Sequence, residues 1–193
     1  ELSDSINYAL RIQSSVLPQA SSLEKIFKEH FILFKPRDVV SGDFYWAARV
    51  GKRIVFTAAD CTGHGVPGAF MSMLCISFLN EVVTNEKTIE ADAILNEARE
   101  YVVRSLQQRG ISGEQKDGMD LALCSINTDT LEMQYAGANN PCWIVRKSND
   151  LPELIILDPD KMPVAIHESM KPFGKKIFQL QKGDMIYLAS DGY

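Results

Sequence analysis

The order of apolar and polar positions along the chain predicts a mixture of helices and strands. Helical spacing of apolar residues predicts three helices, over residues 3–16, 67–83 and 89–107. In the first, Ile6, Leu10 and Val16 form the apolar stripe, and in the last, Thr88 is the expected N-cap. The second is nearly all apolar, which is typical of a buried helix.

Short β-branched and aromatic runs predict the strands. They cover residues 30–35, 43–50, 53–60, 119–126, 131–137, 142–147, 153–157, 176–180 and 185–190. Strands come first, two helices follow, and more strands close the chain. Two antiparallel sheets sandwiched between helices satisfy this order, so the expected fold class is α+β.

Two aspartates are expected to face each other on a hairpin. Gly51-Lys52 suits a two-residue type II′ loop, which would set Val50 opposite Arg53 and Asp43 opposite Asp60. Like charges opposite each other are destabilising, and a divalent cation relieves this repulsion. The alternative is that each Asp only terminates its strand, because Asp favours turns.

Composition narrows the class of protein. A chain of 193 residues is long enough for one domain, and the formal net charge of −5 argues against a general nucleic-acid binder. No apolar stretch is expected to span a bilayer, so no direct membrane insertion is predicted.

The four cysteines lie in apolar segments and form no CxxC pair, so we expect buried free thiols and no zinc site. They favour a reducing, cytoplasmic setting, either for a soluble protein or for the cytoplasmic part of a membrane-attached sensor.

A glycine-rich turn, DCTGHGVPG, joins Asp60 to the second helix. Backbone N–H groups at such a turn can bind an anion, although most glycine-rich turns only punctuate loops. The chain closes on ASDGY, where a third aspartate, Asp191, again follows a strand.

The motifs RDVVSGDFYW, AADCTGHGVPGAFMS, GMDLALC, AGANNP and LASDGY occur in this order. Together they resemble the SpoIIE-like bacterial serine/threonine phosphatases of the metal-dependent PPM superfamily. The resemblance implies a four-layer α-β-β-α sandwich and a centre of two ions, Mn²⁺ or Mg²⁺. It assigns Asp43, Asp60 and Asp191 as metal ligands, with Cys61 contributing its backbone carbonyl, and it gives Asp43 and Asp60 the catalytic role.

The resemblance also implies the reaction, in which a hydroxide bridging two metals hydrolyses phosphoserine or phosphothreonine on a regulatory protein. That partner would be similar to an anti-sigma-factor antagonist. Residues 1–19 resemble a linker helix to an upstream sensor region of the same polypeptide, and residues 20–193 form the phosphatase domain. We expect the linker helix to couple to the loop around Arg37–Gly42 or to pair with a second chain as a homodimer.

Several points depart from the family pattern or stay open. The family uses a further Asp after the SDG motif, so the domain is expected to be truncated at Tyr193. Asp117 and Asp120 are candidates for a looser third metal, Arg37 for phosphate contact and His64 for proton donation, each against a structural or solvated role.

Two other function classes remain. One is a non-catalytic signalling or binding module that keeps the phosphatase fold, and the other is a nucleotide-binding or cyclase-type domain, for which no base-recognition pocket can be named. Manganese-dependent hydrolysis of p-nitrophenyl phosphate separates the phosphatase from both.

Overall fold

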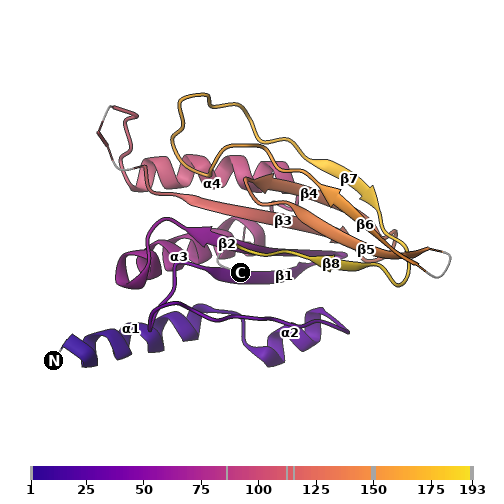
Figure 1. The fold of residues 1–193 in the computed structure, drawn as a ribbon, viewed down its shortest axis with the longest axis horizontal. Coiled ribbons are helices and arrows are strands. Elements are labelled where there is room, and N and C mark those ends of the chain that lie inside the picture. Colours follow the sequence, from indigo (N-terminus) through magenta and orange to yellow (C-terminus); the bar gives the residue numbers. More distant parts are fainter. Residues whose placement is uncertain (1, 86, 112, 115, 149–150, 192–193) are drawn as a thin grey trace.

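The structure is a computed structural model that describes residues 2–85, 87–111, 113–114, 116–148 and 151–191 (Figure 1). Its helices are α1 (Leu2–Val16), α2 (Ala20–Ile26), α3 (Gly65–Leu79) with a π-helical continuation (Asn80–Asn85), and α4 (Ala91–Ser105). Its strands are β1 (Phe44–Val50), β2 (Arg53–Cys61), β3 (Met119–Asn127), β4 (Glu132–Ala138), β5 (Cys142–Ser148), β6 (Leu151–Leu157), β7 (Lys176–Gln179) and β8 (Met185–Tyr187).

The strands form two antiparallel sheets. One has five strands in the order β1-β2-β3-β4-β7, and the other has three in the order β6-β5-β8. Helices α3 and α4 pack on the five-stranded sheet, and α1 packs on α3 (Figure 1). The predicted α+β fold, with two antiparallel sheets and helices, is therefore confirmed.

Each face of the five-stranded sheet carries its own hydrophobic core. Leu121 and Leu123 of β3 belong to the cluster shared with the helices, whereas Ala122 and Cys124 belong to the cluster shared with the three-stranded sheet. This alternation follows from the two-residue period of a strand. The same alternation assigns polar residues at the strand ends to one face or the other.

The predicted strand over residues 30–35 is wrong. His30–Lys35 has no regular secondary structure and joins neither sheet, and Phe31 is 68% exposed. Its apolar side chains instead find local partners: Phe31 lies 6.0 Å from the ring of Tyr187, and Phe34 packs edge-on against Tyr45. The apolar and aromatic run has the composition of a strand, but it does not specify a neighbouring strand to pair with.

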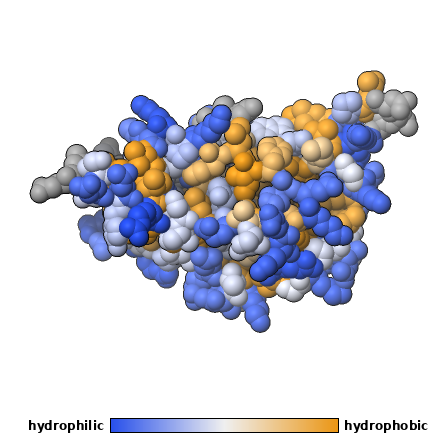
Figure 2. Space-filling view, turned by 90° about the horizontal axis from the view of Figure 1, so that it is seen from below, coloured by the Kyte–Doolittle hydropathy of each residue, from blue (hydrophilic) through white to orange (hydrophobic). Residues whose placement is uncertain are grey.

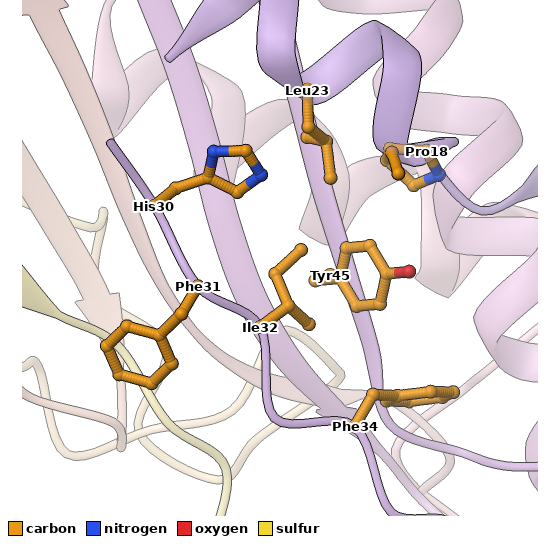
Figure 3. Close-up of a pocket in the computed structure, with 8 residues that line it drawn as sticks. Pro18, Leu23, His30, Phe31, Ile32, Phe34 and Tyr45 are labelled. Atoms are coloured by element: carbon orange, nitrogen blue, oxygen red, sulfur yellow. The ribbon is translucent and has the colours of Figure 1, made fainter. Parts of the chain in front are cut away.

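This segment forms one wall of a groove of about 370 Å³ (Figure 3). Leu23 of α2 and Tyr45 of β1 line the groove together with His30 and Ile32. None of the aspartates singled out in the sequence lines it.

The expected N-cap is also wrong. Helix α4 begins at Ala91 with Glu90 in the capping position, and Thr88 instead donates its backbone N–H to the carbonyl of Val82 (2.9 Å). The π-helical extension of α3 runs to Asn85, so Thr88 closes that helix and does not open the next one.

The apolar stripe of α1 lies on a different side from the one expected. Gln13 and Leu17 are buried, whereas Leu10 and Val16 are each 37% exposed. Figure 2 shows the face that carries α1 and α2, on which hydrophobic patches alternate with hydrophilic side chains. Ile6 is half-buried, as a stripe residue should be.

One helical stretch reaches the length and apolarity of a membrane span, which the sequence analysis did not expect. It runs over Gly65–Asn85, but 56% of its most apolar window is buried inside the fold. Cys75, Ile76 and Leu79 pack in the core against the sheet, as in a buried helix of a globular domain.

Candidate functional site

The first two aspartates meet at the end of the hairpin. Val50 pairs with Arg53, and the register continues to Phe44 opposite Ala59. One further step places Asp43 opposite Asp60, as the sequence predicted. Gly51 has φ +58 and Lys52 has no positive φ, in agreement with a type II′ loop.

Two more aspartates approach the same point. Asp120 is the direct partner of Asp60 across β2 and β3. Asp191 follows β8 of the other sheet, and its carboxyl interacts with that of Asp60. The preceding residue, Ser190, donates its hydroxyl to Asp43 Oδ2 at 2.9 Å. The three-stranded sheet thereby brings its own carboxylate to the hairpin.

The gathering of carboxylates changes their acidity. Burial, a hydrogen bond with Asp191 and the charge of Asp43 together raise the pKa of Asp60 to about 8. Burial also raises the pKa of Asp120, and a hydrogen bond from Asn139 opposes this effect (Nδ2–Oδ1 2.8 Å). An extra positive charge would be strongly favoured here, because it would relieve this mutual repulsion.

Glycines let three backbone segments meet beside these carboxylates. A Cβ atom added to Gly42 would lie 2.9 Å from the carbonyl oxygen of Cys61 and 2.7 Å from that of Gly63. One added to Gly68, on α3, would lie 2.5 Å from the same Gly63 oxygen. Gly42 and Gly68 are therefore required for the close approach, which brings the Cys61 carbonyl against the residue preceding Asp43.

The Cys61 thiol is not a candidate nucleophile. Its side chain is 2% exposed, and its hydrogen bond with Cys75 and its burial raise its pKa well above the ordinary value. All four cysteines are buried and free, as expected. The thiol is therefore excluded, and the backbone carbonyl of Cys61 is what stays a candidate ligand.

The other residues singled out from the sequence differ in their contacts and exposure. His64 Nδ1 lies 3.0 Å from Asp38 Oδ2, which joins the glycine-rich turn to the loop before Asp43. Arg37 is exposed, whereas Asp117 is only partly exposed. Asp43 and Asp191 each interact with Asp60, but among the described residues no three acidic, histidine or cysteine side chains are already spaced to hold a metal ion together.

Three supporting residues were not found from the sequence. Gln13, Asn139 and Ser190 each bond a residue of the acidic cluster or of the loop leading to it. Gln13 could have been found, because it is polar yet falls on the buried side of α1, at helical spacing from Ile6 and Leu17. Asn139 adopts φ +59, a conformation that Asn tolerates better than most residues.

Comparisons with known proteins bear on the family and the fold of this chain. A model of the family described as Stage II sporulation protein E (SpoIIE) matches residues 51–193. No curated protein sequence matches the chain.

Several solved structures resemble the fold of this chain. The SiaA-PP2C domain of Pseudomonas aeruginosa is 28% identical with a TM-score of 0.83, over 99% of this chain and 72% of that one. The RsbU and RsbW domains of Rv1364c from Mycobacterium tuberculosis are 24% identical with a TM-score of 0.59, over 78% and 38%. RsbX in complex with magnesium is 15% identical with a TM-score of 0.56, over 79% and 67%. The last two support the fold alone.

Proposed function

We propose, from the premise that this chain belongs to the SpoIIE family, that it is a metal-dependent protein serine/threonine phosphatase. The observation that carries the proposal is the meeting of Asp43, Asp60 and Asp191 from two sheets, with the pKa of Asp60 raised to about 8. A structural role alone gives no reason to hold like charges together, whereas cation binding does.

The donor atoms at this site fit Mn²⁺ or Mg²⁺, since they are carboxylate and carbonyl oxygens. Asp43, Asp60, Asp191 and the Cys61 carbonyl would hold two such ions. When bound, these ions supply positive charge to the phosphoryl group and activate water. Ser190 would orient Asp43 through the 2.9 Å hydrogen bond between its hydroxyl and Oδ2.

His64 would act on the leaving group. Its ring is held 3.0 Å from Asp38 and its side chain is 71% exposed, so it is open to a protein substrate. A protonated imidazole can give its proton to the departing seryl oxygen, which is otherwise a poor leaving group.

The biological setting is part of the same proposal. The substrate would be a phosphorylated regulatory protein resembling an anti-sigma-factor antagonist, and an upstream sensor would act through α1. A cytoplasmic location is consistent with four free cysteines.

The test is hydrolysis of p-nitrophenyl phosphate and of a phosphoserine peptide with Mn²⁺. We expect Asp60→Asn to lose activity by on the order of 10³-fold, because several kcal/mol of charge stabilisation disappears with the ligand. Asp129→Asn is the matched control, since Asp129 lies on a surface turn and pairs with Lys52. Near-normal turnover by Asp60→Asn would reject the metal assignment, and an inert unmodified chain that still binds a phosphoprotein would favour the non-catalytic alternative.

A further inference from the structure

Thr62, the first residue after β2, closes the β2–β3 ladder in an unusual way. A hydrogen-bonded antiparallel pair normally exchanges two backbone N–H···O bonds. The Thr62 N–H donates to the Gly118 carbonyl at 2.9 Å, but the Gly118 N–H donates to the Thr62 hydroxyl at 3.0 Å. The side chain thus stands in for a backbone carbonyl.

This substitution lets the chain leave the sheet immediately after Cys61. Gly63 and Gly65 follow with φ +89 and +61, so the backbone turns sharply into α3. The turn brings the carbonyl oxygens of Cys61 and Gly63 into close contact with Gly42. With a backbone-only pair, the ladder would hold the Thr62 carbonyl in the plane of the sheet.

Gly118 is itself a fixed reference point. A Cβ atom there would lie 2.5 Å from both the Ala165 Cβ and the Val164 carbonyl oxygen. The neighbouring Met119 exchanges two backbone hydrogen bonds with Val164, at 2.9 and 3.3 Å. Thr62 is therefore bonded to a strand end that cannot shift without moving a third segment.

The position of this pair relates it to the acidic site. Thr62 lies two residues after Asp60, and Gly118 lies two residues before Asp120, the direct partner of Asp60. A two-residue step along a strand returns to the same face of the sheet. The Thr62–Gly118 pair thus lies on the same face as the Asp60–Asp120 pair, with the Cys61–Met119 pair between them along the ladder.

We propose that Thr62 is a positioning residue, whose hydroxyl fixes the Cys61 carbonyl and the Asp60 carboxylate relative to Asp120. The inference rests on the proposed function, because it assumes that these oxygens hold divalent cations. It adds a residue that would touch neither the metal nor the substrate. Its role would be to set the distances between the oxygen atoms that bind the metal.

The chain offers a closely matched control. Thr128 lies at the opposite end of the same strand pair, where its N–H and its hydroxyl both donate to the Lys52 carbonyl, at 2.8 and 3.0 Å. Thr62→Val and Thr128→Val therefore each remove one threonine hydroxyl from an end of the β2–β3 ladder. Only the first is at the acidic end, and Thr62→Ser keeps the hydroxyl there.

The experiment measures Mn²⁺ binding by calorimetry and the Mn²⁺ concentration for half-maximal hydrolysis of p-nitrophenyl phosphate. We expect Thr62→Val to weaken Mn²⁺ binding by about 10-fold or more, the effect typical of residues that orient metal ligands. Thr62→Ser should stay within about 3-fold of the unmodified protein, and Thr128→Val should bind Mn²⁺ normally. Rescue by serine distinguishes positioning from simple loss of stability.

Each outcome decides the question. Normal Mn²⁺ binding by Thr62→Val, or equal weakening in Thr128→Val, overturns the positioning role while leaving the phosphatase proposal intact. Failure of the unmodified protein to bind Mn²⁺ overturns both. A readout that needs no variant is amide exchange at Gly118, which saturating Mn²⁺ should slow while leaving Thr128 unchanged; an unaffected Gly118 would also overturn the role.

Discussion

Gln13 of α1 makes two hydrogen bonds with the backbone of Ser41. Its Nε2 donates to the Ser41 carbonyl at 2.6 Å, and its Oε1 accepts from the Ser41 N–H at 3.0 Å. The Ser41 hydroxyl in turn accepts the N–H of Asp43 at 3.0 Å. A buried side chain of the first helix is thus hydrogen-bonded to Ser41, two residues before Asp43, in the loop where coupling was expected from the sequence.

The first prediction follows from this relationship. Gln13→Ala should destabilise the fold by about 1–3 kcal/mol, because it leaves the buried N–H of Ser41 without a partner, whereas the Ser41 carbonyl keeps the Ser72 hydroxyl at 3.2 Å. It should also raise the Mn²⁺ requirement, since the Asp43 backbone loses its fixed neighbour. Urea unfolding and Mn²⁺ titration measure the two effects. Gln19→Ala is the control, since Gln19 bonds only exposed or partly buried backbone (Ser14 and Leu17); equal behaviour of both variants would contradict the coupling.

The second prediction concerns pH. The pKa of Asp60 is about 8 in the folded protein, against about 3.9 in an unfolded chain. Between these values the folded state binds more protons than the unfolded state, so the metal-free free energy of unfolding should fall as pH rises from about 4 to 8. Urea unfolding with a chelator, from pH 5 to 9, measures this slope.

Asp60→Asn should flatten that slope and raise stability at pH 8, because the charge can no longer form. Asp129→Asn should keep it. Excess Mn²⁺ should oppose the loss at high pH, since it binds the ionised carboxylates of the folded state only. A metal-free protein that grows more stable toward pH 8 would show that these carboxylates do not lie as close as described.

The third prediction separates proton donation by His64 from a structural role. His64→Asn should slow hydrolysis of a phosphoserine peptide by on the order of 10²-fold but leave p-nitrophenyl phosphate nearly unaffected, since nitrophenolate leaves without a proton. Asp38→Asn should act in the same direction through the 3.0 Å contact. His167→Asn should change neither rate, since the His167 ring accepts the N–H of Ser169 in its own loop. Equal loss on both substrates would mean that His64 only shapes the turn.

The fourth prediction divides the two sides of α1. Leu10 is 37% exposed, whereas Ile6 is half-buried. Leu10→Glu should leave thermal stability nearly unchanged and should abolish any self-association seen by sedimentation. Ile6→Glu should lower stability by about 1–3 kcal/mol, since it places a charge at a half-buried apolar position. If both variants sediment and unfold like the unmodified protein, α1 is a passive tether.

The sequence predicted the hairpin well because two independent signals agreed there. Both arms are rich in aromatic, β-branched and small apolar residues, and Gly51-Lys52 suits a two-residue loop, so the facing of Asp43 and Asp60 could be counted outward from Val50 and Arg53. The contribution of Asp191 could not be counted in this way, because it depends on how the two sheets stack. The assignment of Asp191 to the site came from the family resemblance, because the local spacing of residues carries no information on sheet stacking.

The failures share a physical cause. Residues 30–35 have the composition of a strand, but a strand also needs a partner that no local pattern specifies. Thr88 has the chemistry of an N-cap, but the π-helical turn before it uses its N–H to close the earlier helix. Gln13 was passed over because polar residues are usually exposed, although helical spacing already placed it inside.

The alternation along β2 has an evolutionary consequence. Asp60 shares a sheet face with Phe56, on the side of the second sheet, while Cys61 packs among the helices. Deleting or inserting one residue within β2 would exchange these two sides, turning the helix-facing residues toward the second sheet and the acidic set into the core under the helices. An insertion or deletion within β2 is therefore tolerable only when it involves an even number of residues. Proteins that evolve from this one should vary freely in loop length, whereas the length of β2 between its ends should change only by even numbers.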